Sequence, residues 1–129
     1  MTILVAYAPR PEGQAALSKG LEIAKRRNEH LIVVNAGPGG TKEDLSVADA
    51  QDVDRVEELL VKSGLNAEFK QFVRGTSAVA EIEALVDSLP VSLLVIGLRK
   101  RSAVGKLILG SVAQDLLLSV PCPVLAVKA

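Results

Sequence analysis

Short apolar runs alternate with segments of helical periodicity along the whole chain. Residues 2–6 and 91–96 are almost continuously apolar or β-branched, which predicts strands buried on both faces of a sheet. In residues 11–27 the apolar positions instead form one side of a helix, and three consecutive cations favour its C-terminus. The pattern predicts strands over residues 2–6, 30–34, 68–73, 91–96 and 124–127, and helices over 11–27, 48–62, 78–88 and 111–119.

The regular alternation of strands and helices predicts an α/β fold. We expect one domain over residues 1–129, built as a Rossmann-like open five-stranded parallel sheet with helices on both faces. In such sheets, ligands bind beyond the carboxyl ends of the strands, where the strand order reverses. The expected wall of a ligand site is therefore residues 6–9, 34–36 and 96–100, and residues 36–41 are expected to form a loop.

Composition narrows the partners that this fold could have. Apolar residues make up 49% of the chain, but the aromatic residues are only Tyr7, Phe69 and Phe72, so the core is expected to be aliphatic. Few aromatics disfavour stacking on single-stranded nucleic acid, and a formal net charge of zero provides no basic field to attract it. The only cysteine, Cys122, excludes an intrachain disulfide and is expected to be a structural thiol.

The chain enters an apolar strand pattern at once, without a charged leader segment. No apolar run approaches the roughly 20 residues that a bilayer-spanning helix needs. We therefore expect a soluble, cytoplasmic protein with neither a membrane nor a nucleic acid as its partner.

Residues 96–112 carry the strongest chemical signal, because a strand, a basic stretch and a helix follow one another there. Glycine allows close approach of the backbone to a phosphate, and a helix N-terminus offers unpaired N–H groups and a positive dipole end. The segment therefore predicts an anion site, although the same residues also fit a strand end, a helix cap and a solvated loop. Gly97 opens the basic stretch and Gly110, followed by Ser111, closes it, and its cations are Arg99, Lys100, Arg101 and Lys106.

Little else in the sequence suggests chemistry. His30 stands alone at a strand start, without a cluster at metal-ligand spacing. Tyr7 is expected in the core or the pocket wall, and Asp115 on the surface. The sequence has no Ser-His-Asp arrangement, paired carboxylates or P-loop, so we expect a binding protein and not an enzyme.

Four segments of the chain together match the pattern of a known family. They are Ile3-Leu4-Val5-Ala6, the turn Val73-Arg74-Gly75, the segment from Gly97 to Ser111, and the ending Pro121-Cys122-Pro123-Val124-Leu125-Ala126-Val127. Through these segments the chain resembles the universal stress protein family over nearly its whole length. The ATP-binding members carry the pattern Gly-x-x-Gly, nine residues, then Gly-Ser/Thr, whose glycines and hydroxyl hold the phosphates and ribose. Gly97, Gly110 and Ser111 match that pattern at the right spacing.

The resemblance implies a site for ATP or another adenine nucleotide, with or without Mg²⁺. Val34 would line the adenine pocket, Ile96 and Arg99 would flank the ribose and phosphates, and Val112 would follow Ser111. The full set of expected nucleotide-binding residues is Ala6, Ala8, Val34, Ile96, Gly97, Arg99, Lys100, Gly110, Ser111 and Val112.

Two positions depart from the family pattern. Ala8 stands where the family has an acid at the end of the first strand, and the lost acceptor is worth about 1–3 kcal/mol if its partner is left buried. Lys100 stands in place of the second glycine, and lysine costs roughly 1–2 kcal/mol if that position needs a positive φ. Its ammonium could instead bind phosphate, or its stem could fill the phosphate space.

Three functions are therefore to be compared. The first is a nucleotide-binding stress-response regulator in which occupancy biases the 97–110 loop by population shift. The second is a dimeric protein-interaction module whose pocket is occluded by Lys100. The third, an enzyme of the related adenine-nucleotide hydrolases, is disfavoured because the chain has no second domain and no acid–base pair. Family members are usually homodimers, and residues 123–127 would form the pairing edge.

Overall fold

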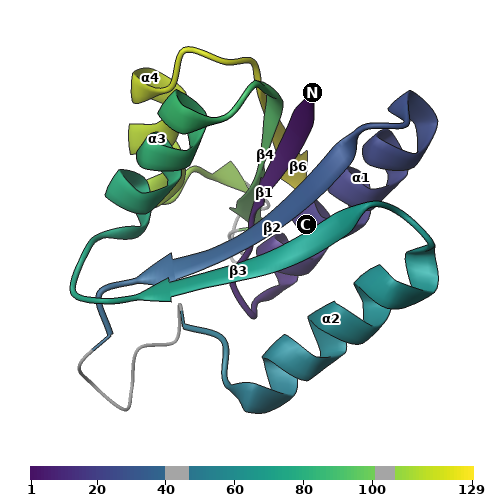
Figure 1. The fold of residues 1–129 in the computed structure, drawn as a ribbon. Helices are drawn as coiled ribbons and strands as arrows, with labels where there is room; N and C mark the ends of the chain where they lie inside the picture. Colours follow the sequence, from purple (N-terminus) through teal and green to yellow (C-terminus); the bar gives the residue numbers. More distant parts are fainter. Residues whose placement is uncertain (40–46, 101–106) are drawn as a thin grey trace.

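A computed structural model describes residues 1–39, 47–100 and 107–129 of the chain. Strands and helices alternate along the chain, except that two strands, Val91–Lys100 and Leu107–Ile108, follow one another before the last helix (Figure 1). The strands are β1 (Thr2–Ala6), β2 (His30–Gly37), β3 (Ala67–Val73), β4 (Val91–Lys100), β5 (Leu107–Ile108) and β6 (Val124–Lys128). The helices are α1 (Pro11–Arg27), α2 (Ala50–Ser63), α3 (Ala78–Ser88) and α4 (Ser111–Ser119).

The sheet confirms the predicted parallel order. β1 pairs in parallel with β2 on one side and with β4 on the other, while β3 extends the sheet beyond β2 and β6 extends it beyond β4. The chain thus moves outward from β1 to β3, returns to the far side of β1 as β4, and ends in β6. The strand order reverses between β1 and β4, so the crevice above these two strands is the expected place for a ligand.

Aliphatic side chains form a core on each face of the sheet. On one face, α1 and α2 cover alternate strand residues such as Ile3, Val5 and Leu31. On the other face, α3 and α4 cover the intervening residues, among them Leu4 and Leu94 (Figure 1). The central strands are therefore buried on both sides, which explains their unbroken apolar sequence. No helix in the described part of the chain is long and apolar enough to cross a membrane.

Two strands run further than the sequence predicts. β2 continues through Ala36 and Gly37, which the sequence analysis assigned to a loop, because β3 offers hydrogen-bond partners as far as Val73. β4 likewise does not end at Gly97. It continues beside β6, with Gly97 opposite Val127, and then pairs antiparallel with the short β5. Local patterns missed these extensions, since the stabilising partners are distant in sequence.

Candidate functional site

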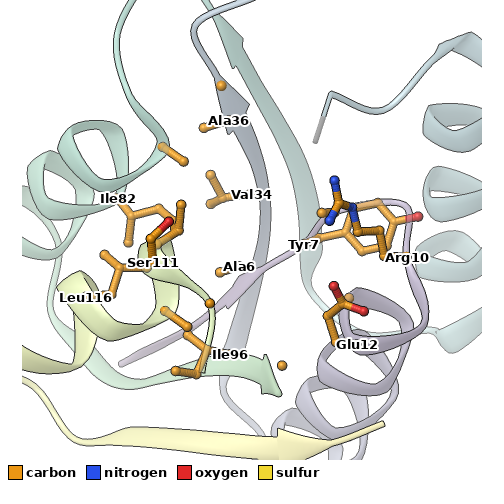
Figure 2. Close-up of a pocket in the computed structure, with 18 of the residues that line it drawn as sticks. Ala6, Tyr7, Arg10, Glu12, Val34, Ala36, Ile82, Ile96, Ser111 and Leu116 are labelled. Atoms are coloured by element: carbon orange, nitrogen blue, oxygen red, sulfur yellow. The ribbon is translucent and has the colours of Figure 1, made fainter. Parts of the chain in front are cut away.

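A cavity of about 390 Å³ opens at the carboxyl ends of β1, β2 and β4, at the reversal of strand order (Figure 2). Its volume is within the usual range for small-molecule sites. Every residue predicted for the nucleotide site lines this cavity except Lys100, whose side chain lies outside the described residues. Arg101 and Lys106 also lie outside them. Tyr7 and Ala36, which belong to the expected wall, line the cavity too. The remaining lining residues were not predicted: Arg10, Glu12, Gly13, Gly37, Pro38, Ser77, Ala78, Ile82, Ala113 and Leu116.

One part of the cavity is apolar. Figure 2 shows Val34 and Ala36 of β2 facing a space that Ile82 of α3 and Leu116 of α4 close from the other side. Val34, Ile82 and Leu116 are almost completely buried, so their positions are set by the core on this face. The result is an apolar compartment suited to a flat ring.

The N-terminus of α4 forms a cationic part of the cavity. Gly110 is its N-cap residue, with no side-chain cap, and Ser111 begins the helix. Among the described residues, only the Nη2 atom of Arg99 would lie near a Cβ atom added at Gly110, at 3.7 Å. A guanidinium thus lies beside a helix terminus whose first N–H groups have no side-chain acceptor from the cap residue. This arrangement suits an anion, because the dipole and the arginine both favour negative charge.

The other helices differ in how their N-termini are satisfied. Asp49 caps α2 in a reciprocal capping box with Asp52, and the Ser77 hydroxyl caps α3 by accepting from the Ala80 N–H. The N-cap residue of α1 is Arg10, which makes no side-chain cap, and Pro11 follows it. The helices α1 and α4 have no side-chain cap. The first turn of α1 carries Glu12 into the cavity, and the first turn of α4 carries Ser111.

Gly97, which lines the cavity, also has a packing role that its motif does not predict. A Cβ atom at this position would lie 2.1 Å from the carbonyl oxygen of Glu12. Gly13 is equally crowded, because its Cβ would lie 1.9 Å from the carbonyl oxygen of Ala8. These glycines let the first turn of α1 press against the ends of β1 and β4. The absence of a side chain at Gly97 is therefore required by packing within the protein, whatever ligand the cavity binds.

A network of buried polar groups lies next to the cavity and includes Tyr7, one of its lining residues. Asn35 donates from Nδ2 to the Tyr7 carbonyl at 2.9 Å, and its Oδ1 accepts from the Ala48 N–H at 2.9 Å and from Gln71 Nε2 at 3.0 Å. The Tyr7 hydroxyl accepts from Gln14 Nε2 at 3.0 Å, and burial raises the pKa of the phenol. This network joins the ends of β1, β2 and β3 to the start of α2 and fixes the position of Tyr7 in the cavity wall.

The turn Val73-Arg74-Gly75, which the sequence analysis singled out, serves the fold. Arg74 Nη2 donates to Oε1 of the buried Glu81 at 3.0 Å, and the guanidinium lies 4.8 Å from the centre of the Phe72 ring. Gly75 has a φ of 79°, in the left-handed region. The turn therefore anchors the first turn of α3, which carries Ser77 and Ala78 to the cavity rim.

The remaining candidates lie away from the cavity. The His30 Nδ1 atom is 2.8 Å from the Asn66 carbonyl oxygen, at the amino end of β2. Asp115 is exposed, as predicted. Cys122 is partly buried beside β6, and burial raises the pKa of its thiol. Within the described ranges there is no group of three or more His, Cys, Asp or Glu residues that could hold a metal ion.

Apart from Ser111 and Val112, the cavity residues that lie on helices are not predicted from the sequence. The expected wall follows the strand ends and stops at residue 9, so it does not include Arg10 and Glu12 at the start of α1. Ile82 and Leu116 were available as apolar positions of amphipathic helices, but the helical pattern does not say which of them stand at the end of the sheet. The close packing of α1 against Gly97 is the signal that identifies Glu12 as a cavity residue, and a local sequence pattern does not show this packing.

Comparison with known proteins gives a consistent result. A model of the universal stress protein family matches residues 1–128. A universal stress protein from Mycolicibacterium smegmatis is 48% identical over 126 residues, covering 98% of this chain and 96% of that protein. The structure of a universal stress protein from Archaeoglobus fulgidus is 31% identical, with a TM-score of 0.78, and the match covers 98% of this chain and 97% of the other. A structure of the universal stress protein from Archaeoglobus fulgidus in complex with dAMP is 25% identical, with a TM-score of 0.74 and coverage of 98% and 96%.

Proposed function

Because the chain belongs to the universal stress protein family, we propose that it binds an adenine nucleotide in the cavity at the carboxyl edge of its sheet. The observation that carries the proposal is the α4 N-terminus without a side-chain cap, with the Arg99 guanidinium beside it. A phosphate placed there would accept hydrogen bonds from the first N–H groups of α4 and from Arg99.

The shape of the cavity orients the nucleotide. The base occupies the apolar compartment between Val34 on the sheet and Ile82 and Leu116 on the helices. The phosphate lies at Gly110 and Ser111, where glycine leaves open space. The sugar then spans the middle of the cavity, at the point where the strand order reverses between β1 and β4. The dAMP complex of the Archaeoglobus fulgidus protein supports this class of ligand, since that protein is similar over nearly the whole chain.

ATP is the nucleotide that we propose as the physiological ligand. Its additional phosphates would extend from Ser111 along β4 toward Lys100, where the family pattern has a glycine. Binding acts by occupancy, not by turnover: the ligand favours one conformation of the protein, and a partner in the stress response recognises that conformation. This mechanism needs no catalytic base.

We further propose that two copies pair through β6. This strand is bound to β4 along one side, and its other side has no strand partner within the described residues. An apolar strand with a free edge invites pairing, and a second copy would satisfy it. Light scattering coupled to size-exclusion chromatography should give the mass of a dimer at micromolar concentration, and the mass of a monomer would contradict this pairing.

Isothermal titration of nucleotide-free protein with ATP, AMP and adenosine tests the nucleotide proposal. We expect micromolar affinity for ATP or AMP and weaker binding of adenosine, because adenosine has no phosphate for α4 and Arg99. The same titrations of Lys100→Ala distinguish a phosphate ligand, whose loss weakens binding, from a plug, whose loss strengthens it. Absence of binding to wild type and variant alike would overturn the proposal and favour a protein-interaction module.

A further inference from the structure

Glu12 is a carboxylate in the cavity to which the family pattern gives no role. It is in the first turn of α1, it is partly buried, and it lines the cavity. Within the described residues, neither Glu12 nor Arg10 forms a hydrogen bond or an ion pair through its side chain. Figure 2 shows Glu12 on the same side of the cavity as Tyr7 and Arg10, opposite Ser111 and Leu116.

Packing fixes the backbone and the Cβ atom of Glu12. A Cβ atom at Gly97 would lie 2.1 Å from the Glu12 carbonyl oxygen and 2.9 Å from its Cβ atom, so Glu12 lies directly against β4. This contact places it at the reversal of strand order between β1 and β4. Its backbone cannot move toward β4, and the next glycine of α1, Gly13, holds the same turn against Ala8.

The chemistry of a carboxylate limits what it can bind there. A carboxylate only accepts hydrogen bonds and repels phosphate, so the matching ligand group is a neutral donor such as a hydroxyl. The base is held by the apolar compartment and the phosphate by α4 and Arg99, which leaves the sugar in the middle of the cavity. An acidic residue that accepts from ribose hydroxyls is a known device of dinucleotide-binding folds. Ala8, on the same wall, has no side-chain acceptor to offer.

We propose that Glu12 is a specificity-determining residue that accepts hydrogen bonds from the ribose hydroxyls of the bound nucleotide. The inference rests on the nucleotide site proposed above. It predicts that this chain selects ribonucleotides over nucleotides that lack the sugar hydroxyls. It also gives a reason for the close packing at Gly97, which holds the acceptor at a fixed distance from the sheet.

The experiment compares affinities for nucleotides that differ only in the sugar. Of ATP and AMP, the tighter ligand is titrated together with its 2′-deoxy and 2′,3′-dideoxy forms, in EDTA so that no metal bridges the carboxylate and the phosphate. Wild type should bind the ribonucleotide about tenfold more tightly than the dideoxy form, since a hydrogen bond to a charged group has about this effect. In Glu12→Gln, which keeps the size of the side chain, the ratio should fall to about twofold.

The ratio of the two affinities, ribonucleotide to dideoxynucleotide, isolates the effect of the sugar hydroxyls from that of the phosphate. Any change in repulsion between residue 12 and the phosphate affects both nucleotides equally and cancels. Glu22→Gln is the matched control, because Glu22 is an exposed acid on the same helix that pairs with Lys19 and Arg26. Its ratio should remain that of wild type.

The outcomes separate this inference from the function on which it rests. If the nucleotide binds but Glu12→Gln keeps the wild-type ratio, the role of Glu12 is wrong and the nucleotide site stands. If wild type binds none of the nucleotides, both are wrong. Glu12→Asp provides a second variant with the charge retained on a shorter stem, and its ratio should be between those of wild type and Glu12→Gln.

Discussion

The two sides of the cavity are built in opposite ways. On one side, α1 begins against the sheet so closely that Gly13 and Gly97 have no room for a Cβ atom. On the other side, α4 begins at Gly110, where a Cβ atom would meet, in the part of the chain that the structure describes, only the tip of Arg99. Both helices lack a side-chain cap, and both carry their first turns to the cavity.

This difference shows that glycines in one sequence motif can have unlike physical causes. Gly97 is needed because another part of the protein occupies the space, whereas Gly110 leaves space that no described part of the protein fills. We call the side formed by the start of α1 with Gly13 and Gly97 the clamped side, and the side formed by Gly110 and the start of α4 the open side. We infer that the clamped side holds its side chains in fixed positions and so determines which sugar binds. The open side would supply the donors and the charge for the proposed phosphate contact.

The largest expected effect comes from adding a methyl group on the clamped side. In Gly97→Ala the new carbon would collide with a backbone carbonyl oxygen at 2.1 Å, and backbone cannot move aside as a flexible side chain can. We expect the free energy of unfolding to fall by about 3 kcal/mol, measured by urea denaturation. Gly110→Ala is the matched control and should lose no more than about 1 kcal/mol. Equal losses in both variants would break the distinction between the two sides.

The next largest effect is expected on the open side and on binding alone. Arg99 is exposed and has no ion pair within the described residues, so Arg99→Gln should leave the free energy of unfolding nearly unchanged. The affinity for AMP should fall about thirtyfold, because a charge-assisted hydrogen bond of about 2 kcal/mol is lost. Adenosine, which lacks the phosphate, is the control ligand, and a comparable loss for adenosine in calorimetry would show that Arg99 does not contact the phosphate.

The sequence predicted the two sides unequally well, for a physical reason. The α1 boundaries follow from local signals, namely Pro11 at its start and the cations at its end, and the structure confirms them. The close approach of α1 to β4 is a contact between segments far apart in the chain, so no local pattern shows it. The same limit explains why β4 was ended at Gly97 and why Glu12 was not selected, while Gly110 and Ser111 were found from the motif alone.

A smaller effect is expected from adding a methyl group on the open side. In Gly110→Ala the new carbon would lie 3.7 Å from Arg99 Nη2, in the space proposed for the phosphate. We expect about fivefold weaker binding of AMP, equivalent to about 1 kcal/mol of crowding, in isothermal titration. Adenosine should bind as it does to wild type. Unchanged AMP affinity would mean that the phosphate lies elsewhere in the cavity.

The smallest effect is expected at Tyr7, on the clamped side, and it depends on pH. Tyr7→Phe removes the acceptor of the Gln14 hydrogen bond, which should cost about 0.5–1 kcal/mol at neutral pH. Because burial raises the pKa of the Tyr7 phenol, the folded protein holds this proton more tightly than the unfolded chain, whose tyrosine pKa is about 10. As the pH rises through that value the unfolded state loses its proton first, so wild type loses stability that Tyr7→Phe, with no phenol, keeps.

The difference in unfolding free energy between wild type and Tyr7→Phe should therefore shrink at alkaline pH, which urea denaturation over a pH series measures. Tyr7 is the only tyrosine and the chain has no tryptophan, so the ultraviolet absorbance of tyrosinate reports its ionisation directly. A difference that stays constant with pH, or an absorbance titration at the pKa of free tyrosine, would show that the clamped side admits water to the ring. In that case the close packing found at Gly97 and Gly13 would not extend across the cavity wall to Tyr7.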